Sequence, residues 1–185
     1  MGSDRLAGDS GDDEGPTRLV TVGSMSIGRT CVSVADFAVF AEATGYRTTA
    51  ETAGTGWVGS SEGEWIVGAD WRAPDGHNTA ADAGASVVQL SWYDCQEFCR
   101  WSGTLLPTEA QWARAGLVDG SVWQWCADFY HPTFHRDEQR VNPTGPISGT
   151  ERVLRGGSPV ATQRAHHMGD FASDSTGFRV VAARR

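Results

Sequence analysis

The chain has 185 residues, a formal net charge of −8, eight Trp and four Cys, and all fifteen of its basic residues are Arg. The absence of Lys excludes a P-loop phosphate site and Schiff-base chemistry, and the acidic balance argues against a surface for nucleic acid or an anionic membrane. Because no apolar run is long enough to span a bilayer and the N-terminus does not resemble a leader, we expect a cytoplasmic protein whose Cys side chains are thiols.

The composition changes once along the chain. Residues 1–16 contain four Asp and one Glu and almost nothing apolar, which predicts a disordered acidic tail. From residue 17 to residue 185 the composition is that of a folded protein, with no internal repeat and no second linker. The sequence therefore predicts one globular domain behind an acidic tail.

Two helices are predicted in the first part of the domain, each from an N-cap residue followed by apolar residues at helical spacing. Ser33 caps the first helix, which is expected to end at Gly45. Ser91 and Asp94 form a capping box at the start of the second helix, which is expected to end at Gly103. The residues expected on the buried faces are Val34, Phe37, Phe40, Ala41, Trp92, Cys95, Phe98 and Cys99.

A third helix and four short strands complete the predicted elements. Pro107 precedes the capping box of Thr108 and Gln111, and Trp112 and Ala115 are expected to face inward. The predicted strands are Leu19–Val22, Ser86–Leu90, Arg152–Arg155 and Gly177–Ala182. Because helices come early and strands mostly late, the pattern favours the α+β class over an alternating α/β sheet.

The Cys residues permit either metal chemistry or packing. There is no C-x-x-C motif, which excludes a zinc ribbon, but Cys95 and Cys99 lie four residues apart and share one helical face. Two thiolates there would suit a metal or a redox pair, whereas the apolar residues on the same face favour core packing. Cys126 is also expected to be buried, and the environment of Cys31 is left open.

Four of the five His residues fall in the last third of the chain. His131 and His135 are spaced for one helical face, but Pro132 lies between them, which favours an exposed loop. His166 and His167 are adjacent, so on a strand their side chains point apart and only one serves a given site. Spacing alone favours surface or structural roles for these His residues over metal or acid–base chemistry.

Six segments occur in order along the chain: ATGYRTTAE, GADWRAPDG, VVQLSWYDCQEFCRWSGTLLPTEAQW, SVWQWCADFYHP, NPTGPISGTERVLRGGS and GFRVV. Together they resemble the formylglycine-generating enzyme family, also called sulfatase-modifying factors, from residue 17 to residue 185. The resemblance implies a variant of the C-type-lectin-like fold, an irregular mixed α/β single domain with long loops.

Active members of that family oxidise a Cys of a sulfatase to formylglycine with copper and dioxygen, and two thiolates hold Cu(I) because soft sulfur suits that ion. The family pattern is Gly-Gly-Ser, two residues, Cys, four residues, Cys. Here the serine is Ser158, the first Cys position holds Ala161 and the second falls on His166. The resemblance therefore implies that both copper thiolates are absent.

Other family positions are retained or altered. The resemblance implies that Ser158 and Trp123 line the catalytic pocket with His166. Arg155, Arg179 and Trp123 are candidates for substrate binding, although holding loops is the favoured role of the two Arg side chains. We predict no calcium, because residues 113–121 replace a long calcium-binding segment, and the second calcium motif reads Ser-Val-Trp-Gln over residues 121–124.

Three functions follow as hypotheses. The first is a metal-dependent, dioxygen-using oxidoreductase acting on a thiol, amino-acid or peptide substrate, with iron(II) or copper on His166, His167 and a carboxylate such as Asp170. The second is a non-catalytic module that binds a peptide, a small molecule or a partner protein. The third is ordinary formylglycine generation by an alternative thiol pair, for instance Cys126 with another Cys. The retained Ser158 and Trp123 favour the first hypothesis.

Overall fold

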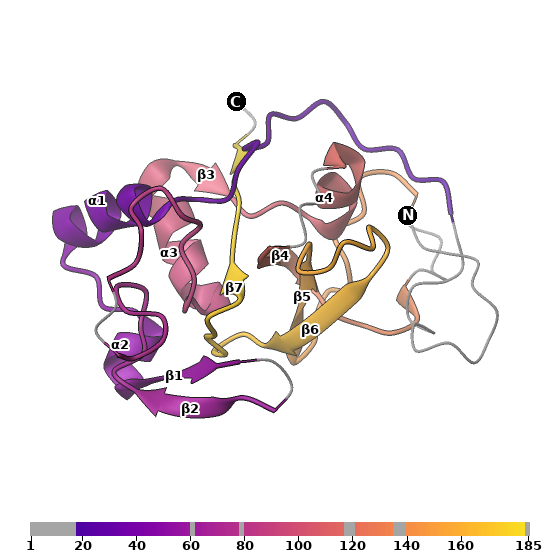
Figure 1. The fold of residues 1–185 in the computed structure, drawn as a ribbon. Helices are drawn as coiled ribbons and strands as arrows, with labels where there is room; N and C mark the ends of the chain where they lie inside the picture. The colour runs from indigo at the N-terminus through magenta and orange to yellow at the C-terminus, as the bar shows by residue number, and fades with distance from the viewer. Residues whose placement is uncertain (1–17, 60–61, 78–79, 117–120, 135–139, 184–185) are drawn as a thin grey trace.

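The computed structural model describes residues 18–59, 62–77, 80–116, 121–134 and 140–183 (Figure 1). The elements in chain order are α1 (Val34–Thr44), α2 (Thr49–Ala53), β1 (Thr55–Val58), β2 (Glu64–Val67), α3 (Trp92–Ser102), β3 (Thr104–Leu105), α4 (Glu109–Ala115), β4 (Trp123–Phe129), β5 (Glu151–Arg155), β6 (Arg164–Met168), β7 (Thr176–Gly177) and β8 (Val181–Ala182). This mixture confirms the α+β class. The predicted acidic tail lies outside the described residues, as does His135.

The three predicted helices are α1, α3 and α4, and all three are confirmed. Each begins with a capping box, including α1, for which the sequence predicts only the N-cap Ser33. In each box the N-cap side chain accepts the backbone N–H of N3, and the N3 side chain accepts the N–H of the N-cap. These bonds satisfy donors that a helix start leaves unpaired. The N-cap residues are Ser33, Ser91 and Thr108, and the left-handed glycines that end the helices are Gly45, Gly103 and Gly116.

None of the helices in the described ranges is long and apolar enough to cross a membrane.

Within the described residues, the strands form three small sheets. The largest has the order β6-β5-β4-β7, in which β4 and β7 run parallel and the other neighbours run antiparallel. The β1–β2 hairpin and the β3–β8 pair form the two others. The predicted strand Arg152–Arg155 is confirmed within β5, whereas Gly177–Ala182 is strand only at its ends, in β7 and β8.

Two predicted strands are wrong. Leu19–Val22 makes a single bridge, at Thr21, which bonds to the backbone on either side of Val141, while Leu19 is exposed. Ser86–Leu90 is irregular because Gln89 has a φ of 57°, which interrupts the extended backbone. The N–H groups of this segment consequently bond to two separate parts of the chain instead of one strand.

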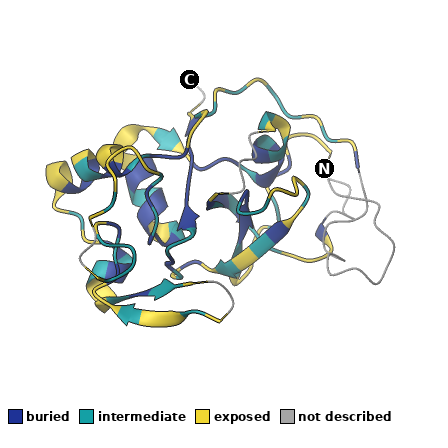
Figure 2. Ribbon diagram, in the orientation of Figure 1, coloured by how far each residue is buried: buried dark blue, intermediate teal, exposed yellow. Residues whose placement is uncertain are grey.

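Aromatic side chains, several of them from α1 and α3, form much of the main core. Figure 2 colours much of α3 as buried. The Phe37 ring lies 5.2 to 6.0 Å from those of Phe40, Trp71 and Phe98, mostly edge to face. Cys95 and Cys99 are buried in the same cluster, which confirms the packing role that the sequence favours for them. Elements α1, α2, α3 and the β1–β2 hairpin gather on one side of the molecule, and α4 lies with β4, β5 and β6 on the other (Figure 1).

Candidate functional site

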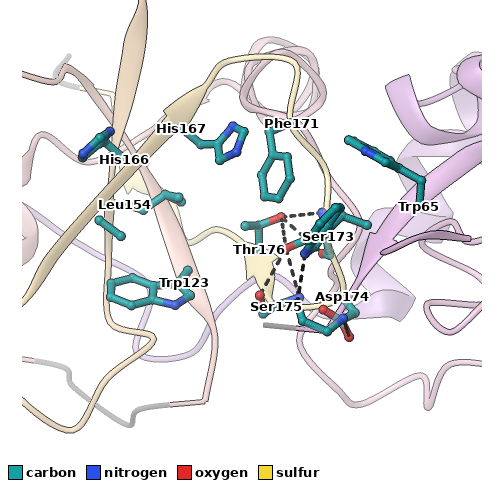
Figure 3. Close-up of a pocket in the computed structure, with 13 residues that line it drawn as sticks. Trp65, Trp123, Leu154, His166, His167, Phe171, Ser173, Asp174, Ser175 and Thr176 are labelled. Atoms are coloured by element: carbon teal, nitrogen blue, oxygen red, sulfur yellow. Dashed lines mark hydrogen bonds between the residues drawn. The ribbon is translucent and has the colours of Figure 1, made fainter. Parts of the chain in front are cut away.

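A pocket of about 840 Å³ lies between the β1–β2 hairpin, β6 and the segment that leads into β7 (Figure 3). Its volume is in the range of small-molecule sites. Two backbone bonds join the hairpin to the segment: Trp57 N–H donates to the carbonyl of Ala172, and Asp174 N–H donates to that of Trp57. The pocket is therefore built from parts of the chain more than a hundred residues apart.

Aromatic rings form one wall of the pocket. Trp57 and Trp65 are cross-strand partners in the hairpin, so both side chains lie on one face of it, with ring centroids 5.7 Å apart. Phe171 lies 6.1 Å from Trp65 and 6.4 Å from Trp57, and His167 stacks on Phe171 at 3.6 Å. Figure 3 shows Phe171 between His167 and Trp65, with Trp123 on the other side of the pocket.

The polar part of the lining comes from a tight turn before β7. The Oγ of Ser173 lies 3.1 Å from that of Ser175 and 3.3 Å from Oγ1 of Thr176. Asp174 Oδ2 accepts the N–H of Gly59 at 3.0 Å, which ties the turn to the end of β1. The hydroxyls thus bind one another, while Asp174 brings a carboxylate to the pocket.

The two adjacent His residues point to opposite faces of β6, as the sequence predicts. His166 stacks on Tyr130 at 3.8 Å, and its Nδ1 lies 3.0 Å from Oε1 of Glu151. His167 is half-buried against Phe171, and its Nδ1 accepts the N–H of Met168. Burial lowers the pKa of His167, although the carboxylates of Glu151 and Asp170 oppose the shift.

The residues present do not match a copper or iron site. His166 and Glu151 supply two donors on the face away from His167, and the residue at the first thiolate position, Ala161, supplies none. Across the described parts of the chain, no three side chains of His, Cys, Asp or Glu come together to hold a metal. Binding of iron or copper by His166 and His167 stays a prediction.

Trp123 borders the pocket, and the Gly-Gly-Ser loop lies against it. A Cβ placed on Gly157 would meet three indole atoms of Trp123 at 2.3 to 2.4 Å, so only glycine permits this approach. Ser158 follows in the chain, and its Oγ accepts the N–H of Val160 at 3.1 Å, which closes a turn. The structure therefore places Trp123 in the pocket and Ser158 in the adjoining turn, and the catalytic role of both stays a prediction.

Arg155 and Arg179 are buried and bond to the protein itself. Arg155 donates to Oε1 of Glu109 at 3.2 Å and to the carbonyls of Ala161 and Thr162. Arg179 donates to the carbonyls of residues 28 and 29 and to Oε1 of Gln124. These contacts hold loops, which is the role that the sequence favours, and neither residue borders the pocket. Substrate binding by either residue stays a prediction.

Gln124, which lies in the altered calcium motif, links its own strand β4 to two other parts of the chain. Its Oε1 accepts Nε1–H of Trp112 at 2.8 Å and Nε–H of Arg179 at 2.5 Å. The side chain is fully buried, and these two hydrogen bonds satisfy its carbonyl oxygen, which water cannot reach. The amide thereby connects α4, β4 and the segment between β7 and β8.

Sequence reasoning did not single out Trp57, Trp65, Phe171 or Asp174. A signal was available for the hairpin, because TGWV and EWIV are short aromatic and β-branched runs separated by Gly and Ser. Phe171 and Asp174 carried no comparable signal, since the hairpin residues that they contact in the pocket are more than a hundred residues away in the chain.

Comparison with known proteins gives a consistent family assignment. Residues 1–117 match the family model described as "Sulfatase-modifying factor enzyme 1-like domain". The formylglycine-generating enzyme of Streptomyces coelicolor is 29% identical over 254 aligned positions, which cover 91% of this chain and 81% of that protein. The inactive C-alpha-formylglycine-generating enzyme 2 of Bos taurus is 35% identical over 148 positions, covering 68% of this chain and 48% of that protein.

The solved structure of PvdO from Pseudomonas aeruginosa has a similar fold. It superposes with a TM-score of 0.71 over 97% of this chain and 88% of that chain, at 16% identity. This likeness confirms the predicted fold class. The alignment with the Streptomyces protein, at 254 positions, is longer than the 185-residue chain, so parts of that relative have no counterpart here.

Proposed function

The chain belongs to the formylglycine-generating enzyme family, also called sulfatase-modifying factors, and on that premise we propose that it is a ligand-binding module of the family. The module takes a small molecule or a peptide side chain in the aromatic pocket and does not generate formylglycine. One observation carries the proposal: the pocket with Trp123 is well formed, while the thiolate positions hold Ala161 and His166.

The remaining thiols offer no replacement for the missing copper ligands. All four Cys side chains are buried thiols outside any disulfide, and Cys95 and Cys126 have no exposed surface. Burial raises the pKa of both thiols well above the ordinary value, and copper and catalysis both need the thiolate. This environment argues against formylglycine generation through Cys126.

The pocket itself suits binding. It combines large aromatic faces with a few polar groups, the usual composition of small-molecule sites. Trp65 is 54% exposed, so the aromatic wall is open to an incoming ligand. Trp57, Phe171 and Trp123 are half-buried and held by packing, which keeps the wall in place without a ligand.

A second candidate is the metal-dependent oxidoreductase, and the contact between His166 and Glu151 favours it. Imidazole and carboxylate are ligands of iron sites that activate dioxygen, but such sites use three protein donors. Metal analysis of anaerobically reconstituted protein beside His166→Ala tests this candidate. One equivalent of iron or copper, lost in the variant, supports it, and no metal in either protein rules it out.

The proposed function is tested by a thermal-shift screen of a diverse library of small molecules and peptides. We expect hits whose stabilisation disappears in Trp65→Ala, because that change removes part of the pocket wall. The matched control is Val67→Ala, which alters an exposed residue of the same strand that does not border the pocket. Hits that both variants retain, or a library without hits, would contradict the proposal.

A further inference from the structure

The composition of the pocket narrows the ligand class, an inference that rests on the proposed function. We infer that the pocket binds an organic cation with a methylated ammonium group, held by the faces of Trp57, Trp65 and Phe171 beside the carboxylate of Asp174.

The aromatic wall supplies the first argument. Trp57 and Trp65 meet at an interplanar angle of 78°, Trp65 and Phe171 at 80°, and Trp57 and Phe171 at 50°. Rings at such angles turn their faces in different directions, so one ammonium group can contact more than one electron-rich face. Attraction of a cation by aromatic faces, strongest for Trp, makes this arrangement selective for positive charge.

The charges around the pocket supply the second argument. Asp174 is the carboxylate among the described residues that border it, and the other titratable residues there are His166 and His167. No Arg of the described chain borders the pocket, although every basic residue of the protein is Arg. Burial lowers the pKa of His167, which favours its neutral form. Asp174 therefore brings to the pocket a negative group, of the same sign as the net charge of −8.

The hydrogen bonds inside the pocket favour a methylated ammonium over one rich in N–H groups. The hydroxyls of Ser173, Ser175 and Thr176 bond to one another, and Thr176 Oγ1 also donates to backbone carbonyls. A primary ammonium brings three N–H donors that need acceptors once water is displaced; Asp174 can accept from some of them, and donors that stay unpaired are costly. A trimethylammonium group has no N–H donor and needs only charge and surface.

Two sources carry this chemistry: a free quaternary amine and a methylated Lys side chain of a peptide. The full chain is titrated by calorimetry with choline and with 3,3-dimethylbutan-1-ol, which has the same shape without the charge. A trimethyllysine peptide and its norleucine counterpart form the second arm. We expect at least one cation to bind about tenfold or more tightly than its neutral partner. The arm that binds identifies the source.

Variants test whether the named groups provide the selectivity. Trp65→Ala should weaken cation binding by about 2- to 30-fold, whereas Val67→Ala should leave it unchanged. Asp174→Asn should weaken it by about fivefold, and Asp174→Glu should restore part of the loss because it keeps the charge. Asn retains an acceptor for the N–H of Gly59, and thermal unfolding of each variant verifies the fold.

Three results would overturn the inference: equal binding of the neutral partners, no binding of either cation at millimolar concentration, or cation binding that Trp65→Ala and Asp174→Asn leave unchanged. Its failure is distinguishable from failure of the proposed function. If the library yields neutral ligands that depend on Trp65, the pocket is a binding site and only the cation class is wrong.

Discussion

The buried ion cluster at the start of α4 provides a quantitative test of how the fold supports the pocket. Glu109 Oε1 accepts Nε–H of Arg164 at 2.7 Å, and Oε2 accepts an Nη2–H of the same guanidinium at 3.1 Å. Arg155 donates to Oε1 as well, and all three side chains are at most 4% exposed. Arg164 begins β6, the strand that carries His167, so the cluster supports one side of the pocket.

Glu109→Gln removes the carboxylate charge that two buried guanidinium groups share. Breaking a buried ion pair from one side costs about 3–5 kcal/mol, which lowers the melting temperature by roughly 6–20 °C in a chain of this size. Thermal and urea unfolding followed by circular dichroism measure the loss. Glu97→Gln is the matched control, because Glu97 and Arg100 form an exposed pair worth about 1 kcal/mol or less. A loss below about 1 kcal/mol in Glu109→Gln, or equal losses in both variants, would refute the reasoning.

Three further variants test other contacts. Burial and the nearby Glu109 raise the pKa of the Asp128 carboxyl to about 7. The folded protein therefore binds the carboxyl proton more tightly than the unfolded chain does, so the free energy of unfolding falls as the pH rises from about 4 through 7. Asp128→Asn should remove that loss, at most about 1.4 kcal/mol per pH unit, and identical pH profiles of melting temperature would contradict this. Gly157→Ala should cost about 1–3 kcal/mol and change the Trp fluorescence, because its Cβ meets the Trp123 ring; unchanged fluorescence and stability would contradict it. Asp94→Ala should cost about 2–4 kcal/mol in urea unfolding, because the buried carboxylate accepts two backbone N–H groups and a Tyr hydroxyl; a loss below 1 kcal/mol would count against it.

The helices could be predicted because their signals are local. Ser91 and Asp94 lie three residues apart, and their capping box specifies the start of α3 whatever the distant chain does. The strands were harder, because their partners are distant: β7, at Thr176, pairs with β4, at Trp123. Ser86–Leu90 has a strand-like composition, but the left-handed Gln89 interrupts it, a conformation that composition does not reveal.

The site was predictable only in part for the same reason. Trp123 was identified through its motif, and the opposite orientation of His166 and His167 followed from the alternation of side chains along a strand. The wall formed by Trp65 and Phe171 depends on the hairpin lying beside a segment near the C-terminus, a contact that no local pattern encodes.

We propose that the pocket binds a ligand without formylglycine chemistry. Mass spectrometry of a peptide with a sulfatase-type Cys motif tests it most directly, after incubation with the protein, copper and dioxygen. The formylglycine-generating enzyme of Streptomyces coelicolor serves as the positive control. We predict that the peptide keeps its mass with this protein and loses the Cys thiol with the control. Conversion of the Cys to formylglycine by this protein would contradict the claim.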